Sequence, residues 1–268
     1  FRVLPNIFCL DEVKGHTISL SDNGELYSFG ESGSYAHGHK DPIFLCKKIS
    51  SLKNVITIAC GPSHTVILDH NGYVFTFGSN FRGALGISKT EKNLKRTFTP
   101  QKVNLPRISQ ISCGKSFTLC VSEDQVLYSF GDNSFGQLGL GTNQKQYNEP
   151  QIIDTFIGIE FIQCGSYHSI CKMENNDIYA WGCNSNGQIG IGSLTTKESS
   201  IIPCFDWPGD VIDIKCGRYH TLVLTSNQNV FSCGNNEYGQ VGRDSDKQNS
   251  TILQKIEELS EIIRIECG

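Results

Sequence analysis

The stretch Phe130-Gly131-Asp132-Asn133-Ser134-Phe135-Gly136-Gln137-Leu138-Gly139 recurs, with changes, four more times along the chain. In each copy a short apolar run ends in glycine and a polar turn follows. A pair of glycines closes the motif, except in the first copy, where Tyr35-Ala36-His37 replaces Gly-Gln-Leu. The first glycines are Gly30, Gly78, Gly131, Gly182 and Gly234, with separations of 48, 53, 51 and 52 residues. Self-similarity at a fixed period of about 50 residues is typical of propellers, solenoids and arrays.

Each repeat contains at least three short runs of alternating residues, which predict strands. In the second repeat these are 55–61, 64–68 and 73–77, and Asn71-Gly72 joins the last two. An Asn-Gly pair between such runs predicts a hairpin with a type I′ turn, which needs positive φ at both residues. Equivalent strands are predicted at 16–20, 26–30, 108–113, 117–121, 126–130, 160–164, 168–172, 178–181, 211–216, 220–224, 230–233 and 262–268.

The segments between these strands are polar and differ freely: 31–54, 84–107, 138–158, 190–210 and 242–261. We expect them to lie at the rim of one face, where partners are usually bound. Only Leu253 to Ile263 has a helical period, and its β-branched end belongs to the next predicted strand. Since one small sheet cannot bury both of its faces, stacked sheets of a propeller are the expected arrangement.

Length, charge and apolar runs exclude several classes of protein. The 268 residues carry a net charge of −4, which argues against nucleic acid as a partner because nucleic-acid-binding domains usually have a strongly basic face. No apolar run reaches the ~18 residues needed to span a membrane. The chain opens at Phe1 without a signal-peptide pattern and stops within a repeat, so we expect one domain, 1–268, cut from a longer chain.

Five of the twelve cysteines hold one repeat position: Cys60, Cys113, Cys164, Cys216 and Cys267. Cysteines fixed in this way usually act as small buried apolar residues, so we expect thiols in the reducing cytosol or nucleus.

These motifs identify a resemblance. The unit Cys-Gly-x-x-His-Thr, followed by Phe/Trp-Gly-x-Asn-x-x-Gly-Gln-Leu-Gly at a period of about 50, resembles the repeat of the RCC1 (regulator of chromosome condensation) family. The resemblance implies an all-β propeller, usually of seven blades with four strands each. Five full units and a partial one are present. A seven-bladed ring only partly contained in this chain is favoured over a ring with fewer blades.

The resemblance leaves two functions open. The first is a protein-interaction or regulatory module. The alternative is guanine nucleotide exchange on a Ran-type small GTPase, which works by coupling GTPase binding to weaker nucleotide binding. Chromatin binding is disfavoured by the acidic balance. No catalytic residues, metal ligands, cofactor or small-molecule substrate are indicated, and the domain is not expected to be an enzyme.

The repeat histidines His16, His64, His168 and His220 are expected to be structural, bonding backbone to hold two strands in register. Phe117 at the equivalent position of the third repeat supports this, because a ring of metal ligands would not include a phenyl group. His37 and His39 could bind a metal weakly, but an exposed pair in a loop is the favoured interpretation.

The candidate partner-binding residues are Lys92, Lys95, Arg96 and Trp207. The first three belong to the basic stretch 89–96, which would contact an acidic partner surface if it is more than a solvated loop. Trp207 lies between two repeats, and either packs onto its blade, which is favoured, or anchors a partner, since Trp is enriched in interface hot spots.

Overall fold

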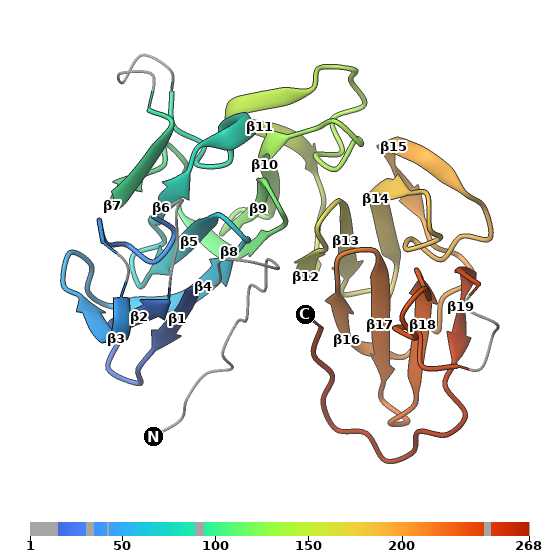
Figure 1. Cartoon of the computed structure of the whole chain (residues 1–268). Coiled ribbons are helices and arrows are strands. Elements are labelled where there is room, and N and C mark those ends of the chain that lie inside the picture. Colours follow the sequence, from blue (N-terminus) through green and yellow to red (C-terminus); the bar gives the residue numbers. More distant parts are fainter. Residues whose placement is uncertain (1–15, 31–34, 42, 89–93, 244–247, 268) are drawn as a thin grey trace. The chain divides into compact units, whose positions relative to one another are not determined.

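The computed structural model describes residues 16–30, 35–41, 43–88, 94–243 and 248–267. Within these ranges the protein is all-β, apart from the single 3₁₀ turn Phe81–Gly83. The chain divides into two compact units (Figure 1). The first unit is Phe1–Asn133 with Gln146–Phe156, and the second is Ser134–Lys145 with Ile157–Gly268.

Each repeat forms one antiparallel sheet whose strands follow the order of the sequence, as in a propeller blade. Three blades belong to the first unit. Blade 1 is β1 (His16–Leu20), β2 (Leu26–Gly30) and β3 (Ile43–Ile49); blade 2 is β4 (Val55–Cys60), β5 (His64–Asp69), β6 (Val74–Ser79) and β7 (Arg96–Lys102); blade 3 is β8 (Ile108–Cys113), β9 (Phe117–Ser122), β10 (Val126–Asp132) and β11 (Gln146–Thr155).

Two blades belong to the second unit. Blade 4 is β12 (Ile159–Cys164), β13 (His168–Met173), β14 (Ile178–Asn184) and β15 (Thr195–Pro203); blade 5 is β16 (Val211–Cys216), β17 (His220–Thr225), β18 (Val230–Gly234) and β19 (Ser250–Lys255). The inner strands therefore coincide with the predicted ones to within a few residues.

The fourth strands were missed because they lie inside the variable segments. β7, β11 and β15 are edge strands with many part-exposed residues, so they lack a clear apolar alternation. They also contain Pro100, Pro150 and Pro203. Proline is tolerated at a sheet edge because its missing N–H faces outward. These prolines therefore lie in the outer strands.

The hairpin turns differ from the predicted type I′. Gly24 and Gly72 have φ of 75° and 78°, whereas Asn23 and Asn71 do not have positive φ. The amide N of Gly72 donates to the Asp69 carbonyl at 3.0 Å, so residues 69–72 form a turn in which only Gly72 is left-handed. Such a loop needs a single positive φ. Gln125, Asn176 and Gln228 hold the same position in blades 3, 4 and 5.

The C-terminal stretch is also not the predicted strand. Residues 262–267 form no strand, and Leu253–Ile263 forms no helix, since its first residues belong to β19. Ile265 instead packs with Leu224, Val230 and Ile256 on blade 5. A strand requires a neighbour with which to exchange hydrogen bonds, and the described residues place none beside 262–267.

Adjacent blades of one unit pack their faces together. In the first unit, one apolar cluster joins blades 1 and 2 and another joins blades 2 and 3. The first repeat glycine lets the third strand approach the loop between the first and second strands of the same blade. A Cβ on Gly131, whose φ is 111°, would lie 2.4 Å from the Ser116 carbonyl oxygen. No helix among the described residues is long and apolar enough to cross a membrane.

Candidate partner-binding face

Two loops meet at one end of each of blades 2 to 5. The loop between the first and second strands is bonded to the end of the third strand: Ser79 N donates to the Ser63 carbonyl at 2.7 Å, and Cys183 N donates to the Tyr167 carbonyl at 2.8 Å. We call this end, which carries the motif glycines, the glycine-loop end. The other end carries the turn between the second and third strands, and we call it the hairpin end.

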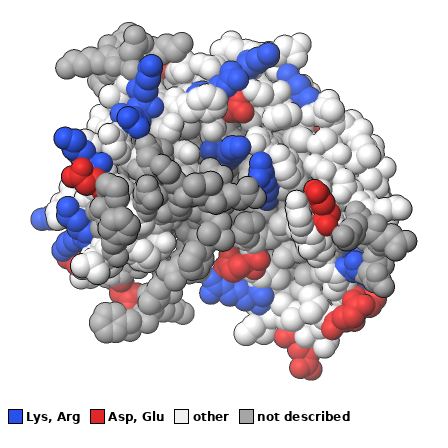
Figure 2. Space-filling view, viewed as in Figure 1, with Lys and Arg blue, Asp and Glu red and all other residues white. Residues whose placement is uncertain are grey.

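Both ends of the blades carry charged side chains. In the first unit the glycine-loop end carries Arg82, Lys95, Arg96 and Lys115, with Asp132 beside Arg82 and the exposed acids Asp41 and Glu149, while the hairpin end carries Lys53, Lys102 and Arg107. In the second unit the hairpin end carries exposed acidic residues: Glu174, Asp177, Asp206, Glu257, Glu258 and Glu261. Figure 2 shows basic and acidic side chains interspersed over the visible surface.

The predicted basic residues lie at the glycine-loop end of blade 2. Lys95 and Arg96 are exposed where β7 begins, and Lys92 lies outside the described residues. The Arg96 guanidinium carbon stands 4.7 Å from the centre of the Tyr35 ring, which meets Phe98 edge-on at 5.8 Å. Arg96 therefore extends from β7 across an aromatic pair.

Lys95, the residue before β7, lines a shallow hollow. The hollow, of about 340 Å³, is formed by the loop after β6 and the start of β11, and Arg82, Gln146 and Asn148 also line it. The Arg82 guanidinium lies 5.4 Å from the Phe81 ring centre and 3.8 Å from an Asp132 carboxylate oxygen. Cations, amide groups and an aromatic ring therefore share one small surface.

In the second unit the glycine-loop end carries an aromatic stack. Tyr167 and Tyr219 are stacked with ring centres 5.4 Å apart, and Phe135 meets Tyr167 edge-on at 5.3 Å. Arg218 lies 5.3 Å from the Tyr219 ring centre. Aromatic and Arg side chains are enriched in protein interfaces.

Sequence reasoning missed these residues because it treated each motif as uniform. Alignment of the repeats exposes them: Tyr167 and Tyr219 replace Ser63 and Ser116 just before the repeat histidine or phenylalanine. Tyr35 similarly stands at the position of Gly136.

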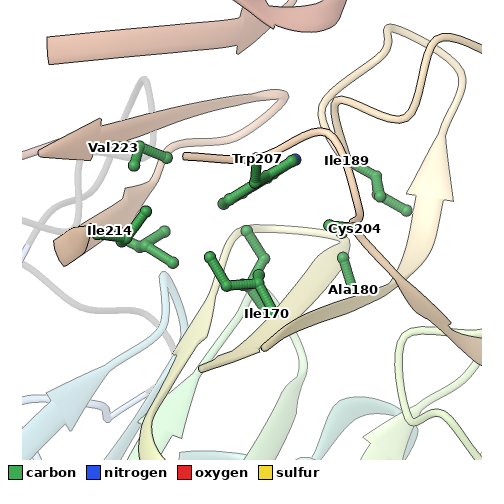
Figure 3. Close-up of a cluster of buried hydrophobic side chains, with 9 residues drawn as sticks. Ile170, Ala180, Ile189, Cys204, Trp207, Ile214 and Val223 are labelled. Atoms are coloured by element: carbon green, nitrogen blue, oxygen red, sulfur yellow. The ribbon is translucent and has the colours of Figure 1, made fainter. Parts of the chain in front are cut away.

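Trp207 is buried, as the favoured interpretation of its segment predicted. Only 8% of the residue is exposed, and the ring packs among Ile170, Ile189, Cys204, Ile214 and Val223 (Figure 3). A Cβ on Gly190 would meet both the Trp207 indole nitrogen at 3.2 Å and the Cys233 sulfur at 3.1 Å. At the equivalent Gly139, such a Cβ would meet Trp181. Trp207 therefore fills space that the motif aromatic, replaced here by Cys233, would occupy.

His16, His64 and His168 bridge blades through a threonine hydroxyl instead of bonding backbone as predicted, whereas His220 Nε2 lies 3.5 Å from Cys267 Sγ. His16 Nε2 lies 3.3 Å from Thr65 Oγ1, and that hydroxyl donates to the Ala36 carbonyl at 2.6 Å. His168 Nε2 likewise lies 3.0 Å from Thr221 Oγ1, which donates to the Gln188 carbonyl. Because each hydroxyl hydrogen is used on a carbonyl, the imidazole must donate from Nε2, which leaves Nδ1 unprotonated.

Burial keeps these imidazoles neutral. It lowers the pKa of His168 to about 3, with the nearby His220 adding to the effect. Burial likewise lowers the pKa of His16 to about 4, helped by His37, and that of His64 to about 4. Neutral, hydrogen-bonded rings between blades fit the structural role that the sequence predicted.

The described residues contain no group of three His, Cys, Asp or Glu that could hold a metal ion. The exposed-loop interpretation of the histidine pair is wrong for His37, which is fully buried and accepts a bond from the His39 amide at Nδ1. No disulfide joins the eleven cysteines of the described segments. Burial raises the pKa of Cys171 and Cys204 to about 12, so these thiols are poor nucleophiles.

Comparison with known proteins gives consistent matches. The chain is 31% identical over 267 residues to the human probable E3 ubiquitin-protein ligase HERC6, covering 94% of this chain and 26% of that protein. It is 31% identical over 236 residues to the ultraviolet-B receptor UVR8 of Arabidopsis thaliana, covering 85% of this chain and 52% of that protein. The chain thus spans about a quarter and about half of these relatives.

Two solved structures share the fold. Yeast RCC1 (Prp20), in its structure bound to Kap60, superimposes with a TM-score of 0.85 at 22% identity, covering 94% of this chain and 62% of that one. Human WBSCR16 gives a TM-score of 0.82 at 21% identity, covering 94% and 67%. The expected all-β, RCC1-like propeller fold is confirmed. Since residues 8–268 also match the RCC1-like domain family, the chain belongs to that family.

Proposed function

We propose that this RCC1-like domain is a protein-interaction module that docks a partner through the glycine-loop ends of its blades, in the cytosol or nucleus. The observation that carries the proposal is the gathering of Arg and aromatic side chains at these ends. Side chains of these two kinds supply most of the binding energy in many interfaces. Tyr238 of blade 5, at the position equivalent to Arg82 and Phe135, is 82% exposed.

The proposal makes the domain a recognition element. The names of the relatives include ligases and a receptor, but these names describe whole proteins of which this chain matches a part. The candidate residues Lys95 and Arg96 belong to the proposed face, and Lys92 lies outside the described residues. Trp207 does not offer its side chain to a partner, because the ring is packed in the core.

A test compares two variants of the whole chain as bait in cell extracts. The first carries Tyr167→Ser and Tyr219→Ser, which restore the residue found in blades 2 and 3. The second carries Glu174→Gln and Asp177→Asn at the hairpin end, as a control. We expect the first variant, still folded by circular dichroism, to lose partners that the wild type and the control retain. Equal partner sets from all three proteins would refute the proposed face.

Guanine nucleotide exchange on a Ran-type GTPase is a second candidate. It is supported by the repeat resemblance and by the likeness to yeast Prp20p, a protein whose structure was reported with its binding properties to Gsp1p and histones. An exchange factor would bind the nucleotide-free GTPase more tightly than the loaded form. Release of fluorescent GDP from Ran should then accelerate when this chain is added, and release at the intrinsic rate would leave this chain without exchange activity of its own.

A further inference from the structure

The glycine-loop ends of blades 1 and 2 carry two strained residues, Tyr35 and Arg82. Arg82 has φ of 59°, although Phe135, Asn186 and Tyr238 at the equivalent positions do not have positive φ. Tyr35 has φ of 66° at a position that is glycine in the other four repeats. A left-handed conformation is unfavourable for a non-glycine residue, because its Cβ comes too close to the following carbonyl oxygen. Such residues concentrate at functional sites, where the side chain is needed in spite of the strain.

The two strained residues contribute to one surface. Arg96 lies over the Tyr35 ring at 4.7 Å, and Arg82 lies beside the hollow that Lys95 also lines. We define the basic rim by the exposed or part-exposed residues that share this end of blades 1 and 2: Tyr35, Phe81, Arg82, Lys95, Arg96 and Phe98.

From this geometry we propose that the basic rim binds an acidic, aromatic-containing segment of a partner protein, with its carboxylate or phosphate oxygens in the hollow. This inference rests on the proposed function and adds the chemistry of the occupant. Charge complementarity identifies it: three cations face one side of a chain whose net charge is −4. Arg binds carboxylates and phosphates with paired hydrogen bonds, and Lys adds a point charge.

The polar lining of the hollow fits oxyanions. The amides of Gln146 and Asn148 line it together with the cations, and the Gln146 amide nitrogen lies 3.4 Å from the Asn148 side-chain oxygen. The floor is tight at Gly83, where a Cβ would lie 2.7 Å from the Asn148 Cα. An oxyanion placed here would meet N–H donors from blades 2 and 3.

The aromatic flank fits a peptide better than a nucleic-acid backbone. Phe81 is 62% exposed. Its ring contacts the guanidinium of Arg82, which lines the hollow. A nucleic-acid site would need a longer basic stripe that tracks the phosphates. Three cations in one hollow and its border instead fit a short acidic segment with one aromatic anchor.

The test uses the whole chain and a fluorescein-labelled dodecapeptide of alternating Asp, Phe and Glu, followed by fluorescence anisotropy. The rim variant carries Arg82→Ala, Lys95→Ala and Arg96→Ala. The matched control carries Lys53→Ala, Lys102→Ala and Arg107→Ala, which remove the same charge from the other end of the first unit. We expect the rim variant to bind about tenfold more weakly or worse, and the control to bind as the wild type does.

Three further probes sharpen the result: the same peptide with Asn and Gln in place of the acids, the peptide with phosphoserine in place of the Asp residues, and a twelve-nucleotide single-stranded RNA. The neutral peptide should not bind. Tighter binding of the phosphorylated peptide would identify phosphate as the source of the oxyanion. Tighter binding of the RNA would overturn the proposal, as would equal losses in the rim and control variants, or no binding by the wild type.

The partner-capture test keeps the two proposals apart. If the tyrosine variant loses partners but the wild type ignores the acidic peptide, the interaction module stands and the acidic occupant is refuted. If the peptide binds the rim but no variant changes partner capture, the rim is a binding site and the wider docking face is refuted.

Discussion

The segments 84–107 and 190–210 both supplied predicted partner-binding residues, and the fold uses them in opposite ways. In the first, Lys95 and Arg96 lie exposed where β7 begins. In the second, Trp207 turns inward and packs between blades 4 and 5. The difference comes from a distant residue, since Cys233 leaves room that the motif aromatic would fill. A large aromatic residue in a variable segment is therefore a partner candidate only when the core has no space for it.

The largest expected effect tests this contrast at Trp207. Trp207→Ala should lower the free energy of unfolding by about 3–5 kcal/mol, because it opens a cavity in the second unit. Phe205→Ala, two residues away and 88% exposed, should change it by less than about 0.5 kcal/mol. Urea denaturation of the two variants gives the comparison. Equal stability of both would contradict the proposed substitution of Trp207 for the motif aromatic.

The next effect concerns acid stability. The pKa of His168 is about 3 in the folded chain and about 6.5 unfolded, so the neutral ring stabilises the fold above pH 6.5 and this contribution is lost as the pH falls toward 3. Between pH 6.5 and 5 one such residue should lose about 2 kcal/mol.

His168→Phe, which copies Phe117 of the third repeat, should reduce that pH dependence by the same amount. Urea midpoints at the two pH values measure it, with His70→Phe on an exposed turn as the control. An unchanged slope in His168→Phe would show that other groups dominate the acid response.

A smaller effect separates two reasons for a glycine in the motif: the positive φ and the close approach of another strand. Gly136 and Gly239 are equivalent and have φ of 79° and 82°. A Cβ on Gly136 would lie 2.6 Å from the Glu198 carbonyl oxygen, whereas one on Gly239 meets nothing within 4 Å. Gly239→Ala should cost about 1–2 kcal/mol from backbone strain alone, and Gly136→Ala more. Thermal denaturation would contradict this interpretation if the two costs were equal.

The smallest effect returns to the basic rim. Tyr35→Gly should raise the free energy of unfolding by up to about 1 kcal/mol, because it relieves the left-handed strain, less what the Arg96 contact contributes. The same variant should weaken binding of the acidic peptide. Arg96→Gln is the companion variant, which removes the cation and leaves Tyr35 strained. A loss of stability in Tyr35→Gly would mean that Tyr35 is retained for packing.

The sequence by itself determined the repeat, the inner strands and the structural role of the histidines. Each of these follows from local alternation or from a residue that recurs at one position, such as Gly131 or His168. Such signals can be recognised in the sequence because every blade packs in the same way and needs the same residue types at the same positions.

Only the tertiary structure decided which residues of the variable segments face solvent. The outer strands take their hydrogen bonds from a neighbouring strand and carry little apolar pattern of their own. The basic rim is assembled from residues of blades 1 and 2, which lie far apart along the chain. Trp207 is buried because of a cysteine 26 positions later in the sequence. Distant neighbours, which no local pattern encodes, set the environment of each of these side chains.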